Sequence, residues 1–400
     1  MKILCVTPAY YPAVAWGGPI ISVHLLNREL VKLGHSVTVL TTTLGLAENK
    51  TQKNMFDGVE VIYLRSWSFG RWFIPRRLRL VIGDKLNNFD MAHIHMIWDP
   101  IGWLAAQTLM QQKKKYIVSP RGSLDPLVFK KHNYALKTII YRLFIKKVLE
   151  NASGFHFTSI YEQEKFFELT KLKKSQSHPI IFNPLDLTEF QKVADKGLLR
   201  KWRLEGREYF LYLGRLSWKK GIDKLIEAFA IVNQSVQDIF LVIAGPDEAG
   251  YKKKLETLTQ AEKLGAKIIF TGLVQGESKL ALLKQARAFI LPSYSENFGM
   301  AVAEAMAAGV PVIISSGVGL KDLIEKYNAG LVFNLDRNPE QNLFEQMRSL
   351  IADSQLRLSL IENGRKLVQE QFNPQAVAEQ MLRFYSAVRQ ITNNSTNLRS

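Results

Sequence analysis

Cysteine and long apolar runs are nearly absent from this sequence of 400 residues. The one cysteine, Cys5, excludes an internal disulfide and is typical of a reducing compartment such as the cytosol. The most apolar stretches, 288–295 and 305–320, are interrupted by Pro, Gly or Ser, and none reaches the roughly 18 residues that span a membrane. The N-terminal MKILCVTPAYYP lacks the long apolar segment of a leader and is typical of a buried strand. We therefore expect a cytoplasmic protein.

Metal-ligand and nucleic-acid motifs are also missing. No Asp-x-Asp pair occurs, and no His or Cys cluster has the spacing of metal ligands, so we expect a reaction without a metal ion or other cofactor. The net charge of +17 is concentrated in residues 1–185, which contain 25 Lys or Arg against 12 Asp or Glu. Such a charge suits an anionic membrane, a phosphate-rich ligand or a nucleic acid. Because no recognised RNA- or DNA-binding motif accompanies it, we do not expect a nucleic-acid partner.

Length and pattern predict two α/β domains. Near-continuous apolar strands alternate with helices, and the alternation begins again at YFLYLGRL, residues 209–216. This rhythm predicts two Rossmann-like, doubly wound domains, 1–185 and 186–375. Residues 376–400 should form a terminal helix, which could pack back on the N-terminal domain, and a frayed tail. Since ligands bind beyond the carboxyl ends of parallel strands, two such domains face to face would form a deep cleft between those ends.

The segment SYSENFGMAVAEAMAAGVPVI is predicted to be a strand-to-helix loop followed by a helix. At the start of that helix, the backbone N–H groups of Phe298, Gly299 and Met300 would be unpaired donors that favour a phosphate. Glu296 precedes these groups, and Glu304 lies about one turn into the helix. Carboxylates beside an anion site suit a ligand whose phosphates are flanked by hydroxyl-rich groups, with a sugar on one side and a ribose on the other. The alternative is an acid favoured by the helix dipole and one solvated glutamate.

Two further loops follow predicted strands. In LGRLSWKKGID, Arg215 and Lys220 leave a strand and precede a helix. Two fixed cations suit a diphosphate, whose charge needs more stabilisation when it departs as a leaving group. The alternative is an ordinary basic surface loop. After the first strand, Gly17 and Gly18 would let the backbone approach a phosphate or a sugar, although in isolation a plain tight turn explains them better.

Together, GGP at 17–19 with the helix after it, GRLSWKKGID at 214–223 and ENFGMAVAEAMAAGVPVI at 296–313 occupy matching places in the two halves. In this order they resemble the retaining family-4 glycosyltransferases, the glycosyl transferases group 1, along nearly the whole chain. The resemblance implies the GT-B fold and the transfer of a sugar from a nucleotide-diphosphate sugar, which is a donor substrate rather than a cofactor.

The resemblance also implies roles for single residues. Glu304 should bind the ribose hydroxyls of the donor, and Glu296 the hydroxyls of the transferred sugar. Arg215 and Lys220 should hold the diphosphate, so that the catalytic residues are Glu296, Arg215 and Lys220. The remaining donor contacts should come from the backbone of five residues, Gly17, Gly18, Phe298, Gly299 and Met300.

The sequence departs from the family pattern in the first domain. Where many members carry a histidine after a strand like KKYIVS, this sequence reads SPRG at 119–122, so that Arg121 stands there and no histidine role can be carried over. The usual Asn-Gly of the linker is Asn-Pro at 183–184. His93 and His95 end another predicted strand. Satisfied core or rim positions explain them, and contact with the acceptor is the alternative.

Two segments combine cations with aromatic or aliphatic residues, RSWSFGRWFIPRRLRL at 65–80 and KKHNYALKTIIYRLFIKK at 130–147. On a helical wheel, one side of the second segment carries four aliphatic residues, Leu136, Ile139, Ile140 and Leu143. Such segments suit the interface of an anionic membrane, where each cation adds about 1 kcal/mol. A core-facing helix with a solvated basic face is the alternative.

The sequence therefore predicts a retaining, metal-independent hexosyltransferase that acts on a saccharide acceptor. We expect this acceptor to be lipid-linked, the product to be a cell-surface polysaccharide, and the enzyme to be peripheral on the inner face of the plasma membrane. Two alternatives stay open: a nucleotide-sugar epimerase of the same fold, and a catalytically silent sugar-nucleotide or membrane-binding module. Intact Arg215, Lys220, Glu296 and Glu304 argue against silence.

Overall fold

The structure is a computed structural model that describes residues 1–400 except 15–17, 70–71, 86–87, 132, 173–177 and 391–400. The chain forms two compact units. Unit 1 consists of Met1–Pro184 together with the C-terminal segment from Pro374, and unit 2 consists of Leu185–Asn373. The domain limits expected at 185 and 375 lie beside these divisions, and the terminal helix belongs to unit 1.

Unit 1 is built on a seven-stranded sheet with the strand order β3-β4-β2-β1-β7-β8-β9. Its parallel strands are β1 (Lys2–Val6), β2 (Ser36–Thr42), β4 (Val59–Leu64), β7 (Met91–His95), β8 (Tyr116–Ser119) and β9 (Gly154–Phe155). At one edge, β3 (Gln52–Phe56) pairs antiparallel with β4. The parallel strands are almost entirely buried, as strands covered by helices on both faces must be.

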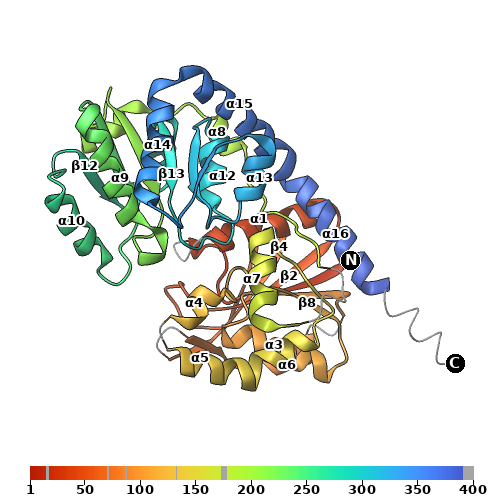
Figure 1. The fold of residues 1–400 in the computed structure, drawn as a ribbon. Coiled ribbons are helices and arrows are strands. Elements are labelled where there is room, and N and C mark those ends of the chain that lie inside the picture. Colours follow the sequence, from red (N-terminus) through yellow and green to blue (C-terminus); the bar gives the residue numbers. More distant parts are fainter. Residues whose placement is uncertain (15–17, 70–71, 86–87, 132, 173–177, 391–400) are drawn as a thin grey trace. The chain divides into compact units, whose positions relative to one another are not determined.

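Helices follow the strands of unit 1 and cover its sheet (Figure 1). They are α1 (Gly18–Lys32), α2 (Leu78–Leu80), α3 (Pro100–Gln111), α4 (Pro126–Lys130), α5 (Tyr134–Ile140), α6 (Lys146–Glu150), α7 (Ile160–Thr170) and α16 (Pro374–Gln390). A small antiparallel hairpin, β5 (Ser66–Phe69) and β6 (Trp72–Pro75), precedes α2. The last helix, α16, packs against α1, and its residues Val377, Met381 and Phe384 share a core with Ile3 and Cys5 of β1. A helix from the end of the chain thus completes unit 1.

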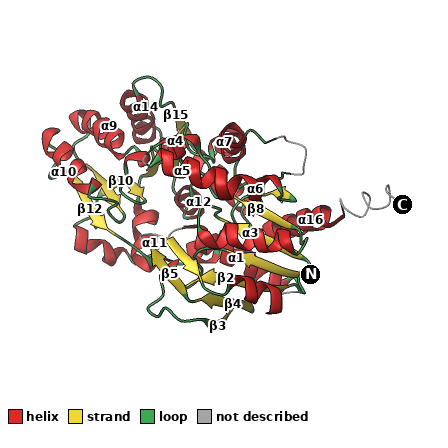
Figure 2. Cartoon of the chain, turned by 90° about the horizontal axis from the view of Figure 1, so that it is seen from below, coloured by secondary structure: helices red, strands yellow, loops and turns green. Residues whose placement is uncertain are grey.

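Unit 2 has a second parallel sheet with the order β12-β11-β10-β13-β14-β15. Its strands are β10 (Glu208–Leu213), β11 (Ile239–Ala244), β12 (Ile268–Gly272), β13 (Ala288–Leu291), β14 (Val312–Ser315) and β15 (Leu331–Phe333). Its helices are α8 (Thr188–Gln191), α9 (Ile222–Ser235), α10 (Tyr251–Ala261), α11 (Gly276–Gln285), α12 (Met300–Ala307), α13 (Lys321–Tyr327), α14 (Pro339–Ala352) and α15 (Ser354–Gln371). Figure 2 shows the helices of this unit around its strands. Over the described residues of both units, every helix is too short or too polar to cross a membrane.

In each sheet the order of the chain reverses between two neighbouring strands, β1 and β7 in unit 1 and β10 and β13 in unit 2. At such a switch point the two connections leave toward opposite faces of the sheet, and ligands bind in the crevice between them. The loops 214–221 and 292–299, which carry the predicted site of unit 2, follow β10 and β13. The fold therefore brings these two loops to the ligand-binding position of their sheet.

Gly221 allows the two loops to touch. It has φ +63°, in the left-handed region, where a Cβ atom costs about 1–2 kcal/mol. A Cβ atom at this position would also lie 2.1 Å from the carbonyl oxygen of Pro292, the first residue after β13. Backbone therefore meets backbone at this crossing, and no larger residue fits without moving one of the loops.

We expect Gly221→Ala to lower the melting temperature much more than Gly250→Ala. Gly250 has a similar φ of +75° but nothing within 4 Å of its Cβ position, so its substitution carries only the backbone cost. At Gly221 the alanine must also displace a carbonyl group, which should add about 1–3 kcal/mol. Thermal unfolding followed by circular dichroism measures both shifts, and equal shifts would show that the loops part freely.

Candidate functional site

The loop after β10 turns Lys220 inward. Residues 214–217 leave the strand, a 3₁₀ turn (η5, Trp218–Lys220) follows, and Gly221 is the N-cap residue of α9. Leu216 anchors the loop, because its N–H donates to the carbonyl oxygen of Pro246 at 2.9 Å. Lys220 is only 9% exposed. A lysine so deeply buried needs a partner for its charge.

The loop after β13 ends at a helix without a side-chain cap. α12 begins at Met300, and its N-cap residue is Gly299, which has φ +97° and offers no side chain. Glycine adopts this backbone conformation without strain. Phe298 is 3% exposed, and its ring packs edge-on against Phe372 with ring centroids 5.3 Å apart, which holds the loop just before the helix. A helix start of this kind presents backbone N–H groups to an electron-rich ligand.

An ion pair between Lys220 and Glu296 joins the two loops. Lys220 Nζ donates to a carboxylate oxygen of Glu296, with 11% and 21% of the two side chains exposed. A second link is the N–H of Tyr294, which donates to the carbonyl oxygen of Lys219 at 2.8 Å. The structure thus brings two predicted catalytic residues into direct contact.

The charges around this pair favour an ionised carboxylate. Burial alone raises the pKa of Glu296, but the attraction of Lys220, Lys219 and Arg215 outweighs burial and leaves that pKa below its ordinary value. Burial, followed by repulsion from Lys220, lowers the pKa of Lys219. The loops therefore hold three basic residues close enough to act on one carboxylate. In the part of the chain that the structure describes, no three His, Cys, Asp or Glu side chains are grouped to hold a metal ion.

Arg215 and Glu304 have other partners. Arg215 Nη1 lies 3.3 Å from Oε1 of Glu248, in the loop after β11, and 57% of the arginine side chain is exposed. Glu304 accepts a hydrogen bond from Lys279 Nζ of α11 at 2.9 Å, with 15% and 17% of the two side chains exposed. Sequence reasoning missed Lys279, because no pattern connects a lysine on one helix with a glutamate on the next.

Two serine hydroxyls at the same loops are buried without a hydrogen-bond partner among the described residues. They are Ser217 Oγ, after β10, and Ser293 Oγ, after β13. An unpartnered buried hydroxyl costs about 1–3 kcal/mol, which a polar ligand or a water molecule at the loops would offset. Sequence reasoning passed over both serines, because serine is common in loops. Cations, an uncapped helix start, carboxylates and hydroxyls at one switch point can together bind a phosphorylated, hydroxyl-rich ligand.

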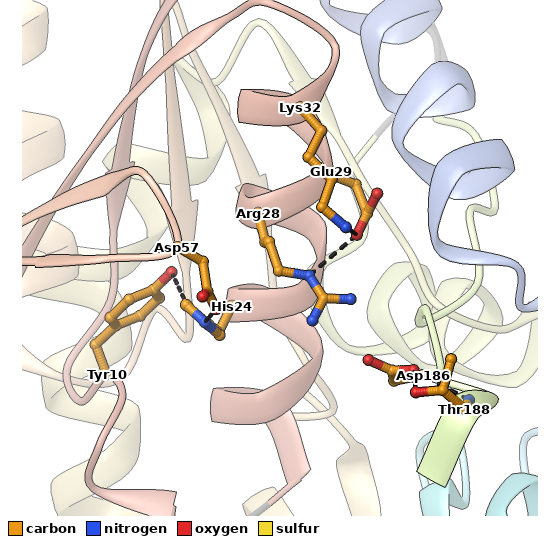
Figure 3. Close-up of polar contacts among 8 residues, drawn as sticks. All are labelled: Tyr10, His24, Arg28, Glu29, Lys32, Asp57, Asp186 and Thr188. Atoms are coloured by element: carbon orange, nitrogen blue, oxygen red, sulfur yellow. Dashed lines mark hydrogen bonds and ion pairs between the residues drawn. The ribbon is translucent and has the colours of Figure 1, made fainter. Parts of the chain in front are cut away.

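At the switch point of unit 1, Gly17 lies outside the described residues and Gly18 is the first residue of α1. Figure 3 shows the polar groups farther along this helix. His24 Nε2 lies 2.9 Å from Oδ2 of Asp57, in the turn between β3 and β4, and His24 Nδ1 lies 3.0 Å from the hydroxyl of Tyr10. Burial lowers the pKa of His24 in spite of the carboxylate. This network fastens the first half of α1 to the loop after β1 and to the β3–β4 turn.

His93 belongs to a buried chain of hydrogen bonds. Its Nδ1 lies 2.8 Å from the hydroxyl of Tyr385 and its Nε2 lies 2.6 Å from Ser119 Oγ. Ser119 Oγ also lies 2.6 Å from Nδ1 of His156, whose Nε2 lies 2.8 Å from the carbonyl oxygen of Ile181. A carbonyl only accepts, so His156 Nε2 carries a proton, and with neutral rings each bond back to Tyr385 has a fixed direction. Burial lowers the pKa of both histidines. His93 is therefore a satisfied core residue that fastens α16.

Two family models match the chain. The model described as "Glycosyl transferases group 1" matches residues 198–367, which include both loops of unit 2. The model described as "Glycosyl transferase 4-like domain" matches residues 17–176, in unit 1. Each unit is thus matched by its own glycosyltransferase model, in the order that the sequence motifs indicate.

Single proteins are similar along most of the chain. Spore coat protein SA of Bacillus subtilis is 30% identical, and the similarity covers 96% of this chain and 99% of that protein. Alpha-monoglucosyldiacylglycerol synthase of Streptococcus pneumoniae is 25% identical over 83% of this chain and 75% of its own length. The crystal structure of Anabaena Alr3699/HepE in complex with UDP-glucose superimposes with a TM-score of 0.70 at 18% identity, covering 97% of this chain and 100% of that chain.

These similarities agree with the architecture and with the loops at its switch points. The expected α/β fold with two Rossmann-like domains is confirmed by the two parallel sheets and by the solved structures that share the fold. The chain belongs to the group 1 glycosyltransferases of the GT-B type.

Proposed function

We propose that the protein is a retaining hexosyltransferase that moves a sugar from a nucleotide-diphosphate sugar to a saccharide acceptor. The proposal rests on the Lys220–Glu296 pair, which joins the two switch-point loops of unit 2 beside the start of α12, a helix start without a side-chain cap. The cations and the helix start suit a diphosphate, and the carboxylates suit sugar and ribose hydroxyls. HepE, whose solved structure contains UDP-glucose, supports a nucleotide sugar as the donor.

In this proposal each charged group binds one part of the donor. Lys220 and Arg215 bind the diphosphate, and Glu296 accepts hydrogen bonds from the transferred sugar. Glu304 accepts hydrogen bonds from the ribose, and its ion pair with Lys279 holds the carboxylate in place. In unit 2, the backbone groups of Phe298, Gly299 and Met300 complete the donor contacts. Gly17 and Gly18 are the donor contacts proposed for unit 1.

The proposed chemistry depends on the leaving group. Negative charge accumulates on the diphosphate as the glycosidic bond breaks, so fixed cations bind the transition state more strongly than the ground state. The acceptor hydroxyl attacks from the face that the diphosphate leaves and gives its proton to the departing phosphate, which retains the configuration without a covalent intermediate. Arg215 and Lys220 supply the positive charge that a divalent ion provides in other diphosphate transfers, so neither a metal ion nor another cofactor takes part.

A donor panel tests the proposal. Purified protein is incubated with different nucleotide sugars in the presence of EDTA, and melting temperature, release of nucleoside diphosphate and product configuration are measured. We expect one donor to be bound and consumed and the product to keep the donor's configuration. A donor at one hundred times its Kd stabilises the protein by about 2.7 kcal/mol, so it is detected even without an acceptor.

Three outcomes would contradict parts of this proposal. Activity that EDTA abolishes and magnesium or manganese restores would contradict the metal-free assignment. An inverted product would contradict retention. Epimerisation of the donor without release of nucleoside diphosphate would contradict the transferase assignment and indicate an epimerase.

The catalytic assignment predicts a loss of kcat when the cations are removed. Arg215→Ala and Lys220→Ala should each lower kcat at saturating donor by about 10²-fold, as the loss of one oxyanion-binding donor does. Arg215→Lys should recover only part of the loss, because an ammonium group cannot form the planar, two-pronged contact of a guanidinium. Circular dichroism shows whether the variants are folded.

Arg348→Ala is the matched control for Arg215→Ala. Arg348 is also an exposed arginine of unit 2, and its Nη2 lies 3.3 Å from Glu345, as Arg215 Nη1 lies 3.3 Å from Glu248. Its loss should leave kcat within about twofold of the unsubstituted protein, since surface ion pairs contribute little. Near-normal kcat in all folded variants of Arg215 and Lys220 would show that this loop does not bind the diphosphate.

We further propose that the acceptor is lipid-linked and that the enzyme works at an anionic inner membrane surface in cell-surface polysaccharide synthesis. The relative named alpha-monoglucosyldiacylglycerol synthase supports a lipid acceptor. The structural support is the segment 134–150, in which α5, the π-helical turn η3 (Tyr141–Ile145) and α6 follow without a break. Its side chains Leu136, Ile139 and Leu143 are 51%, 53% and 64% exposed.

Charge complements this exposed apolar ridge. Exposed cations accompany it, namely Lys130, Lys131, Arg142, Lys146 and Lys147. Of the four aliphatic residues that the helical wheel groups together, only Ile140 faces the core, at 8% exposed. In the hairpin β5–β6, Trp67 and Phe69 are also exposed, and the guanidinium of Arg76 lies 5.3 Å from the centre of the Trp67 ring. Apolar side chains among cations suit a bilayer interface with anionic lipids.

Vesicle sedimentation tests this docking. The protein should bind vesicles increasingly as the anionic lipid fraction rises and less as salt is added, because salt screens surface charge. Leu136→Glu with Leu143→Glu should remove most of the binding. Leu358→Glu, a control at an isolated side chain that is 60% exposed in α15, should not change it. Equal binding to neutral vesicles, or none to anionic vesicles, would contradict the docking surface.

A further inference from the structure

Arg121 is a partly buried cation without a carboxylate in contact. It follows β8 with φ +56°, and its guanidinium is held by two neutral groups. Nε donates to Nδ1 of His95 at 3.3 Å, and Nη1 donates to the side-chain oxygen of Asn183. Within the described residues the guanidinium forms no ion pair, and its Nη2 is not engaged. All three residues belong to unit 1.

Glu162 acts on this charge without contacting it. It raises the pKa of Arg121, which burial lowers overall. Both of its oxygens are occupied, because Oε1 accepts from the N–H of Gly122 and Oε2 from the N–H of Thr158, each at 2.7 Å. Glu162 therefore fixes the backbone beside Arg121 and leaves the guanidinium without a touching counter-ion.

Besides Nη2 of Arg121, Nε2 of His95 is a hydrogen-bond donor without a partner among the described residues. It is 1% exposed, and its Nδ1 must accept because a guanidinium only donates, so the neutral ring carries its proton on Nε2. Burial, followed by repulsion from His93 and Arg121, holds the pKa of His95 well below its ordinary value. In the described part of the chain, Nε2 is buried without a partner. The groups that contact Arg121 are thus neutral and supply no negative charge.

A role limited to holding Asn183 in place would not require a charged side chain. Taking a guanidinium out of water without a negatively charged partner in contact is costly, and the cost is offset when an oxyanion binds to it. The guanidinium suits a phosphate or a carboxylate in particular, since its planar N–H groups can bind two oxygens of one anion. His95 and Asn183 hold the plane of the group at the carboxyl ends of β7 and β8, the edge of the sheet where ligands of parallel sheets bind.

We propose that Arg121 binds an oxyanion, a phosphate or a carboxylate, of the acceptor substrate, and that His95 and Asn183 are its positioning residues. The inference rests on the proposed transferase function and names the class of acceptor, one that carries a negative group. The residues proposed for that group belong to unit 1, whereas the charged residues proposed for the donor belong to unit 2.

Inorganic phosphate is the probe for this site. Its binding is measured by calorimetry at constant ionic strength in the variant Arg215→Ala/Lys220→Ala, which lacks the proposed diphosphate contacts. We expect this variant to keep one saturable phosphate site, and addition of Arg121→Gln to weaken that site at least tenfold. Absence of phosphate binding in the double variant, or undiminished binding after Arg121→Gln, would overturn the proposal.

Donor affinity separates this site from the proposed function. Arg121→Gln alone should bind the nucleotide sugar found in the donor panel as tightly as the unsubstituted protein does. A loss of donor affinity equal to the loss of phosphate affinity would assign the oxyanion to the donor and overturn the acceptor assignment. If no nucleotide sugar binds even the unsubstituted protein, the proposed function fails, whatever the phosphate result.

His95→Gln provides a second variant, which keeps the positive charge of Arg121. It removes the ring that holds Arg121, so phosphate affinity should fall several-fold while donor affinity stays the same. If Arg121→Gln does not fold, this variant decides the question. Unchanged phosphate affinity in folded His95→Gln would contradict the positioning of Arg121.

Discussion

The backbone contact between Gly221 and Pro292 is the constraint on which the site of unit 2 depends. The loops after β10 and β13 leave neighbouring strands, and at their crossing there is room for only a hydrogen atom. This closeness lets Lys220 reach Glu296 and lets the N–H of Tyr294 reach the carbonyl oxygen of Lys219. A buried lysine is expensive to hold without a partner, so the carboxylate also stabilises the loop before any ligand arrives. The charges proposed for catalysis and the local fold of the loops therefore depend on the same ion pair.

The fold could be predicted from the sequence because its strands are short apolar runs with helices between them. KILCV and IFLVIA, for example, are β1 and β11, and both are almost fully buried. The loops that carry the proposed site could be located for the same reason, because ligands of parallel sheets bind at the loops after the carboxyl ends of the strands. The partners of the charged residues could not be predicted. Glu304 contacts Lys279 and Arg215 contacts Glu248 only because separate helices and loops pack together. The periodicity of the sequence does not predict such contacts.

The segment 134–150 shows that a helical wheel does not determine which residues are buried. Leu136, Ile139 and Ile140 all lie in α5, yet only Ile140 is buried. Residues 141–145 then form a π-helical turn, which holds more residues than an α-helical turn, and Ile145 is the next buried residue. The buried residues of the segment are Ile140, Ile145, Val148 and Leu149, whereas Leu136, Ile139 and Leu143 remain outside. Composition identified the segment as amphipathic, and only the backbone decides which of its aliphatic residues meet the core.

The attachment of α16 to unit 1 has a consequence for how the protein is made. Tyr385, Met381 and Phe384 complete a core that begins with the third residue of the chain, yet the ribosome reaches them only after all of unit 2. At about 5–20 residues per second, synthesis of the intervening roughly 190 residues takes about 10–40 s. During that time, α16 does not yet cover its apolar face of the first sheet. Unit 1 thus begins to leave the ribosome before unit 2 but is finished after it, and its nascent form exposes this apolar face to chaperones and to aggregation.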